Sequence, residues 1–274
     1  MLTIAFLAHD GVRNADMWEN WLRAADTVRA VAHDESDEIK RIPGIEYVPP
    51  WRIVHTKGWG TPSVVTAAVA LLAFAIKQNP DATHIALVSG RDIPLFQAED
   101  LLSEVVEFSP ATSYLQFAVD DMDALIRPHH AAMVLARDHA RFIVDVWDSE
   151  LEGAVAELSL AMARDGERAF PDELAFGMLL QAAKMVQEDR EVVDFAKARA
   201  KDRHPNTWDG TKPKDPVKIV EVFLDDKGRE RQERKEASLA QCMTAAVKER
   251  DALFFRKVEH MTWKAWKRWY DSIP

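Results

Sequence analysis

Cysteine is almost absent from this chain, and glycine is scarce. The one cysteine, Cys242, excludes an intramolecular disulfide and any zinc site built from several cysteines. Glycine accounts for only 10 of 274 residues. No segment is low in complexity and no internal repeat occurs, so neither a repeat array nor a low-complexity chain is expected.

A long apolar run is also missing. The longest such run, Val64–Ile76, is too short and too rich in alanine to span a bilayer. The first residues, Met1–Leu7, lack a basic start and a cleavage site, which favours a first β-strand over a signal peptide. These features predict a soluble protein in the cytoplasm of a bacterium, or of a cell infected by a virus.

Positive charge is in deficit, because the net charge at pH 7 is −10. A broad nucleic-acid-binding surface needs an excess of lysine and arginine and is therefore disfavoured. A local basic groove for an anionic nucleotide remains compatible with an acidic surface. The composition itself, with 47% hydrophobic and 29% charged residues, is globular.

Strand-like and helix-like runs alternate in the first half of the chain, which is typical of an α/β sheet. The runs that read as strands are Leu2–Ala8, Arg29–Ala32 and Thr83–Val88. The runs that read as helices are Asp16–Val28, Ser63–Lys77 and Ala98–Phe108. Ligands of such sheets usually lie at the carboxyl ends of the strands, so a nucleotide is expected there.

The second half is less regular. Strands are expected at Thr112–Val119, Ala131–Leu135 and Ala252–Lys257, a hairpin from Val217–Phe223, a loop over Lys201–Asp215, and helices at Asp138–Trp147, Leu151–Arg164, Pro171–Val186, Leu239–Lys248 and Thr262–Tyr270. No linker stands out. We expect one domain over residues 1–274, with a nucleotide-binding half (1–110), an acceptor and catalytic half (111–260) and a C-terminal aromatic-basic helix (261–274).

Several blocks, taken in order, resemble one known family. They are Ile4–Asp10 with Trp18–Leu22, Ala30–Asp34, Trp59–Val65, His84–Leu95, Met133–Arg137, Pro171-Asp172-Glu173 and Leu253–Lys257. No single block is specific, but their order and spacing cover nearly the whole chain. The chain resembles the core-2/I-branching glycosyltransferases, a family that includes β-1,6-N-acetylglucosaminyltransferases, xylosyltransferases and related plant and viral proteins.

The resemblance implies a GT-A-like (Rossmann-like) nucleotide-sugar fold, a mixed sheet flanked by helices. It implies transfer of a sugar, with inversion, from a nucleotide-sugar to an acceptor hydroxyl. The expected donor is a UDP-sugar, the acceptor is a glycan, a protein or a modified nucleobase, and no cofactor or metal is expected. The sugar, the linkage and the oligomeric state cannot be read from the sequence.

Glu173 matches the glutamate of the family's Pro-Asp-Glu motif, which serves as general base there. A base must take the proton of the acceptor hydroxyl, which is worth roughly 10²–10⁴-fold in rate. Taken alone, Asp172 and Glu173 are ordinary acids in the first turn of a helix that opens at Pro171.

Charge on the departing diphosphate must also be neutralised. Lys257 matches the late lysine of the family, and Arg256 is a further candidate. A second cation should precede it by some twenty residues, where Arg234 or Lys235 is nearest, although a solvated charged stretch explains them equally.

The remaining candidates surround the donor and the sugar. Those near the nucleotide and diphosphate are His33, Asp34, Ser63, Ser89 and Arg91, and those near the sugar or acceptor are Asp92, Trp59, Asp172 and Asp121. The Asp34 carboxylate is suited to accept hydrogen bonds from the hydroxyls of a ribose, but the alternative is that Asp34 only stabilises a turn. Trp59 either lines the uridine pocket or packs under the following helix.

Three rival interpretations remain. Asp121-Met122-Asp123 is an Asp-x-Asp sequence that suits a metal-dependent enzyme, although it follows a different strand from the expected one. The tail Trp263–Tyr270 alternates cations with aromatics that suit stacking on bases, so the acceptor could be a hydroxymethylated base in DNA. Alternatively, this tail is an amphipathic helix that packs Trp263, Trp266 and Tyr270 on the domain. The third rival is a non-catalytic binding relative.

Overall fold

The computed structural model describes residues 1–36, 40–58, 60–106, 111–115, 132–164, 170–186, 192–194, 204–209, 220–224, 230–234, 243–244, 247, 252–256, 258 and 261–273. In these residues, seven strands form one mixed sheet in the order β3-β2-β1-β4-β7-β6-β8. The strands are β1 (Leu2–Ala8), β2 (Val28–Asp34), β3 (Ile45–Tyr47), β4 (His84–Ser89), β6 (Ser113–Leu115), β7 (Met133–Ala136) and β8 (Val192–Asp194).

The first four strands of this order run parallel, since β2 pairs with β1 and β3, and β1 pairs with β4, all in parallel. β7 then runs antiparallel to both β4 and β6. The order 3-2-1-4 is that of doubly wound nucleotide-binding sheets, in which the winding reverses between β1 and β4. The antiparallel β7 distinguishes this sheet from an all-parallel one.

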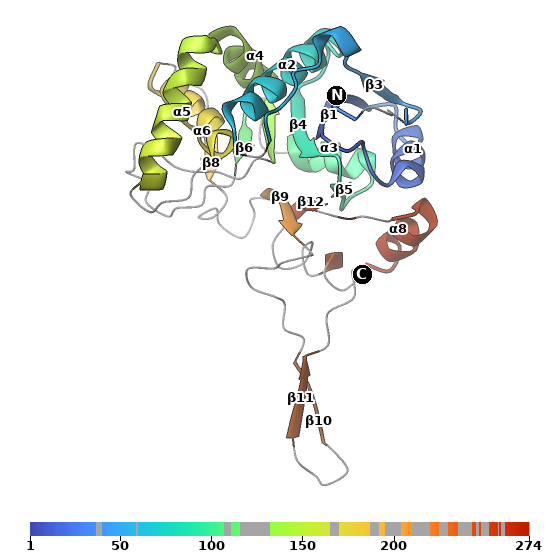
Figure 1. Cartoon of the computed structure of the whole chain (residues 1–274). Helices are drawn as coiled ribbons and strands as arrows, with labels where there is room; N and C mark the ends of the chain where they lie inside the picture. The colour runs from blue at the N-terminus through green and yellow to red at the C-terminus, as the bar shows by residue number, and fades with distance from the viewer. Residues whose placement is uncertain are drawn as a thin grey trace.

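Helices cover both faces of the sheet (Figure 1). On one face lie α1 (Ala15–Arg23), α3 (Ala98–Val106) and α8 (Trp263–Tyr270), and on the other lie α2 (Pro62–Gln78), α4 (Arg137–Val146), α5 (Ser149–Arg164) and α6 (Pro171–Val186). Each face of the sheet has its own hydrophobic core, because successive side chains of a strand point to opposite faces. In β1, Leu2, Ile4 and Phe6 pack against the helices of the first face, and Ala5 packs against those of the second. The predicted α/β architecture, a mixed sheet flanked by helices, is confirmed.

The C-terminal part of the chain contributes most of a smaller sheet and a two-stranded ribbon. The order β5-β12-β9 joins β5 (Ile93–Pro94), β12 (Ala252–Arg256) and β9 (His204–Asp209). β10 (Val220–Leu224) and β11 (Glu230–Arg234) pair in antiparallel fashion and project away from both sheets in Figure 1. A short 3₁₀ turn, η1 (Pro50–Arg52), follows β3.

Some predicted boundaries were wrong. The helix predicted over Asp16–Val28 ends at Arg23, and β2 already begins at Val28 and continues through Asp34 rather than ending at Ala32. Part of the predicted loop Lys201–Asp215 is β9. Pro205 suggested a loop, but a proline is tolerated in an edge strand, and β9 stands at the end of its sheet.

Other predictions were confirmed closely. α6 has the predicted bounds, Pro171–Val186, and the predicted hairpin exists as β10 and β11. The predicted helix Leu239–Lys248 lies largely outside the described residues, as does most of Thr112–Val119 beyond β6.

Candidate functional site

A cavity of about 240 Å³ opens at the carboxyl ends of β1 and β4, where the winding of the sheet reverses. In doubly wound sheets this is the usual place for a ligand. Its lining comes from several separate segments of chain. The lining residues are Leu7, Ala8, His9, Asp10, Gly11, Glu35, Thr56, Gly58, Val64, Leu87, Val88, Ser89, Gly90, Arg91, Asp92, Ala132 and Asp172.

The turn after β4 is held by one carboxylate. Asp92 is fully buried, and its two oxygens accept hydrogen bonds from the backbone N–H of Ser89 (2.8 Å) and from the hydroxyl of Ser89 (2.7 Å). Asp92 was predicted at the floor of a sugar site, and it does line the cavity. Its bonds within the turn also make it the residue that shapes the turn.

The turn after β4 packs tightly on the loop after β1. The backbone N–H of Arg13 donates to the carbonyl of Gly90 (2.7 Å). A Cβ at position 90 would lie 2.6 Å from the carbonyl oxygen of Gly11 and 2.9 Å from the Cβ of Ala8. Only glycine allows this approach, so Gly90 fixes the distance between the two strand ends that form the cavity.

A cation and an acid face each other at this junction. Nη2 of Arg91 lies 3.3 Å from Oδ2 of Asp10, and both side chains are partly exposed. An ion pair so exposed to water contributes little to stability. The guanidinium is therefore the described cation best suited to meet an anionic group in the cavity.

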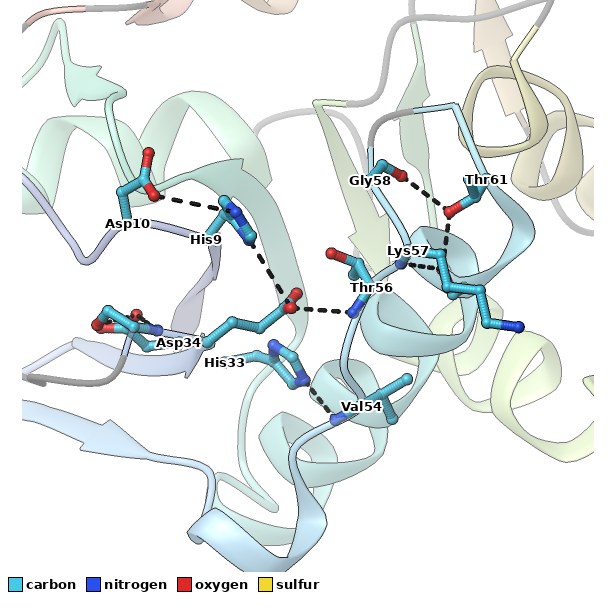
Figure 2. Close-up of polar contacts among 12 residues, drawn as sticks. His9, Asp10, His33, Asp34, Val54, Thr56, Lys57, Gly58 and Thr61 are labelled. Carbon is cyan, nitrogen blue, oxygen red and sulfur yellow. Dashed lines mark hydrogen bonds and ion pairs between the residues drawn. The ribbon is translucent and has the colours of Figure 1, made fainter.

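A second polar cluster, which the sequence did not predict, follows β1 and β2 (Figure 2). Nδ1 of the exposed His9 lies 3.7 Å from Oε2 of Glu35, and that oxygen accepts the backbone N–H of Thr56 at 2.9 Å. Nε2 of His9 lies 4.0 Å from Oδ1 of Asp10. The signal that could have identified His9 and Glu35 is their position just past the ends of two parallel strands.

His33 and Asp34, both predicted near the nucleotide, are buried and serve local structure. Nε2 of His33 accepts the backbone N–H of Val54 (3.0 Å), so the ring joins β2 to the segment after η1 (Figure 2). Burial lowers the pKa of His33, against the opposing effect of the Glu35 carboxylate. Oδ1 of Asp34 accepts both the N–H and the hydroxyl of Ser36. Neither His33 nor Asp34 is among the residues that line the cavity.

Ser63 stabilises the turn that leads into α2. Its hydroxyl oxygen accepts the backbone N–H of Lys57 (2.9 Å) and lies 2.7 Å from the hydroxyl of Thr61, which in turn donates to the carbonyl of Gly58 (Figure 2). Gly58 and Val64, on either side of this turn, line the cavity. Trp59 lies outside the described residues.

The amino end of α6 reaches the same cavity. Asp172 is 5% exposed and lines the cavity together with the turn after β4. Glu173 follows it in the first helical turn, is partly exposed, and donates its backbone N–H to the carbonyl of Phe170 (2.9 Å). The structure therefore brings Pro171-Asp172-Glu173 next to Ser89–Asp92, with Asp172 rather than Glu173 among the lining residues.

The predicted cations of the C-terminal part are only partly described. Lys257 and Asp121 lie outside the described residues, and of Arg256 and Arg234 only the backbone, in β12 and β11, is described. β12 pairs with β5, the strand that directly follows the turn Ser89–Asp92. The backbone N–H of Val258 also donates to the carbonyl of Arg91 in that turn (2.9 Å). The backbone on each side of Lys257 is thus attached beside the cavity, whereas Arg234 belongs to the projecting ribbon.

Asn14 completes this attachment. Its side-chain amide donates to the carbonyl of Val258 (2.9 Å), and its Oδ1 accepts the backbone N–H of Met261 (2.6 Å). Its backbone is left-handed, with φ 57°, a conformation that asparagine tolerates better than most residues. Asn14 and Arg91 therefore hold Val258 from both sides.

The aromatic tail forms α8 and packs on the domain. Trp266 is fully buried and donates to the carbonyl of Pro94 (2.7 Å), and Trp269 is also buried. Trp263 and Tyr270 stack on the two sides of Trp266. The predicted amphipathic helix is confirmed, with Trp269 as an additional buried residue. The two buried indoles are not exposed for stacking on bases.

A scan against protein-family models finds no match, and a search of curated proteins finds no similar sequence. Among the described residues, no helix is long and apolar enough to cross a membrane. In that same part of the chain, no group of three or more His, Cys, Asp or Glu side chains is arranged to hold a metal ion. The metal-free reaction accordingly stays an expectation.

Proposed function

We propose that this protein is an inverting glycosyltransferase with a GT-A-like fold, which transfers a sugar from a nucleotide-sugar to an acceptor hydroxyl. One observation carries the proposal: a single cavity joins the Ser89–Asp92 turn at the carboxyl end of β4 with the amino end of α6 at Asp172. These are two of the blocks on which the resemblance to core-2/I-branching glycosyltransferases depends. A UDP-sugar is the proposed donor.

Glu173 is the proposed general base. It would take the proton of the acceptor hydroxyl while that oxygen attacks the anomeric carbon from the face opposite the diphosphate. Its neighbour Asp172 lines the cavity directly, which makes it a competing candidate for the same role. Both acids stand in the first turn of α6, where acidic residues interact favourably with the positive end of the helix.

Arg91 is proposed to meet the leaving diphosphate together with Lys257 and Arg256. Arg91 lines the cavity, and its carbonyl binds the residue that follows Lys257. Fixed cations aimed at a leaving group stabilise the charge that develops on it in the transition state. Asp92, the last residue of the turn after β4, is proposed to face the transferred sugar.

Two measurements test the proposal. A thermal-shift screen with UDP, GDP, CMP and their sugars should raise the melting temperature with at least one nucleotide-sugar, because a ligand of the folded state stabilises it. Glu173→Gln should then lower the rate of transfer, or of donor hydrolysis, by roughly 10²–10⁴-fold. Asp172→Asn is the matched variant.

The outcomes separate the assignments. If no nucleotide or nucleotide-sugar shifts the melting temperature, the proposed function fails. If Glu173→Gln reacts at the parent rate while Asp172→Asn does not, the base is Asp172. Loss of activity on addition of EDTA would overturn the metal-free reaction.

A further inference from the structure

A segment without helix or strand forms part of the cavity wall. Residues 53–58, the strap, connect η1 to the turn that leads into α2. Thr56 and Gly58 of the strap line the cavity, as does Glu35, just past the end of β2. A change in the position of the strap would therefore change the shape of the cavity.

Two side chains at the end of β2 hold the strap (Figure 2). The backbone N–H of Val54 donates to Nε2 of His33 (3.0 Å). The backbone N–H of Thr56 donates to Oε2 of Glu35 (2.9 Å). Both acceptors belong to ionisable side chains, so the attachment of the strap depends on their protonation states.

The hydrogen bond from Val54 fixes the protonation state of His33. A ring nitrogen of histidine accepts a hydrogen bond only when it carries no proton, so the neutral ring must have its proton on Nδ1. A second proton would make Nε2 a donor that faces the donor N–H of Val54. Protonation of His33 is therefore incompatible with this attachment of the strap.

Opposing influences act on the protonation of the His33 ring. Its complete burial lowers its pKa from the ordinary 6.5, and the exposed His55 of the strap acts in the same direction. The carboxylates of Glu35 and Asp34 oppose this effect and favour the charged ring. Among the described residues, Nδ1 of His33 has no hydrogen-bond partner, so the charged ring can turn toward these carboxylates without breaking another bond.

We propose that the strap is a pH-sensitive wall of the cavity, which neutral His33 holds closed and protonated His33 releases. Protonation frees Val54 first, and the charged ring then competes with the N–H of Thr56 for the Glu35 carboxylate. Once Thr56 and Gly58 leave the wall, the cavity holds its ligand less tightly. This device acts on any ligand of the cavity, so it is independent of the proposed function.

Hydrogen exchange tests the strap without a ligand. Amide protection of Val54 and Thr56 is measured by NMR between pH 5 and 8, with the rates corrected for the intrinsic effect of pH. Because release takes up one proton, protection should fall by up to about 10-fold for each pH unit between 6.5 and the lowered pKa of His33. The amide of Ala5, inside β1, should stay better protected than both strap amides at every pH.

His33→Gln is the matched variant, because glutamine can accept the N–H of Val54 but does not titrate. Protection of its strap amides should not depend on pH over this range. Glu35→Gln keeps an acceptor for Thr56 but removes a charge that favours protonated His33, so its strap should be released at a lower pH.

Two other histidines serve as controls. His55 lies on the strap, and Nδ1 of His9 is 3.7 Å from Oε2 of Glu35, so either could titrate in place of His33. His55→Gln and His9→Gln should both keep the pH dependence of the parent.

The His33 ring also gives a readout in the parent protein, which stands even if a variant fails to fold. Its ¹⁵N chemical shifts should show a proton on Nδ1 alone at pH 8, and on both nitrogens at the pH at which protection is lost. The proposal is overturned if Nε2 carries the proton at pH 8, if His33→Gln keeps the pH dependence, or if His55→Gln or His9→Gln abolishes it. Equal protection of Ala5 and the strap amides would also overturn it, whereas the thermal shift with nucleotide-sugars judges the proposed function separately.

Discussion

At the residue scale, the space around Gly90 determines how closely two strand ends approach. Gly90→Ala would place a Cβ 2.6 Å from a backbone oxygen, and such overpacking costs about 1–3 kcal/mol. We expect the free energy of unfolding, measured with urea, to fall by that amount.

Gly153→Ala is the control for this change. Nothing lies within 4 Å of a Cβ at position 153, which is inside α5. Alanine is favoured over glycine in a helix by roughly 0.5–1 kcal/mol, so this variant should be as stable as the parent or more stable. Equal effects of the two substitutions would contradict the close-packing argument.

His33 makes stability depend on pH. Burial lowers its pKa below the ordinary value of 6.5, so the folded protein resists protonation that the unfolded chain accepts. The contribution of His33 is therefore complete above about pH 6.5 and is lost as the pH falls from there toward the lowered pKa.

The measurement compares the parent with His33→Gln in urea denaturation between pH 5 and 8. Glutamine can accept the N–H of Val54 but does not titrate, so the difference in unfolding free energy between the two proteins should shift in favour of the variant as the pH falls. A difference that stays constant over this range would show that His33 does not titrate differently on folding.

At the scale of elements, Asn14 joins the loop after β1 to the segment between β12 and α8. Asn14→Gly removes two hydrogen bonds, each worth about 1 kcal/mol, but keeps the left-handed backbone accessible. Asn14→Ala also strains that backbone, which adds about 1 kcal/mol. Hydrogen exchange of the Met261 amide should accelerate in both variants.

The two variants are to be compared with each other. Alanine should destabilise more than glycine in urea denaturation, because only alanine resists the positive φ. If the Met261 amide exchanges at the parent rate in both, Asn14 does not hold this segment.

Elements with a clear period were predictable, and those set by distant partners were not. The apolar run Leu2–Ala8 predicted β1, and Pro171 predicted the start of α6. β9 was missed because Pro205 reads locally as a loop, and its pairing with β12 depends on residues nearly fifty positions away. Local patterns carry no information on such a partner.

The candidate site, like the fold, was predictable only in the parts that have a local sequence pattern. The turn at Ser89–Asp92 and the acids of α6 were expected near one another, and the cavity includes residues of both. Glu35 and His9 were missed because each is a single polar residue outside any motif, and only the pairing of β1 with β2 brings the two side chains together. The burial of His33 could not be foreseen, since it depends on Val54 from another segment.

At the scale of the whole molecule, the mixed sheet places segments from both ends of the chain around one cavity. β1 and β4 come from the first third, α6 from the second half, and β12 and Val258 attach to the cavity turn from near the carboxyl terminus. The three-stranded sheet β5-β12-β9 is therefore part of the same structural unit as the turn after β4.

This arrangement has a consequence for biosynthesis. Asn14 and Val258 are 244 positions apart, and Trp266, which seals the surface near Pro94, is made later still. On the ribosome, the loop after β1 gains its last contacts only after the 244 residues up to Val258 have been made. Nascent chains stalled before Val258 should therefore expose the apolar surface near Pro94, which Trp266 otherwise covers, to chaperones and proteases. The finished protein should not.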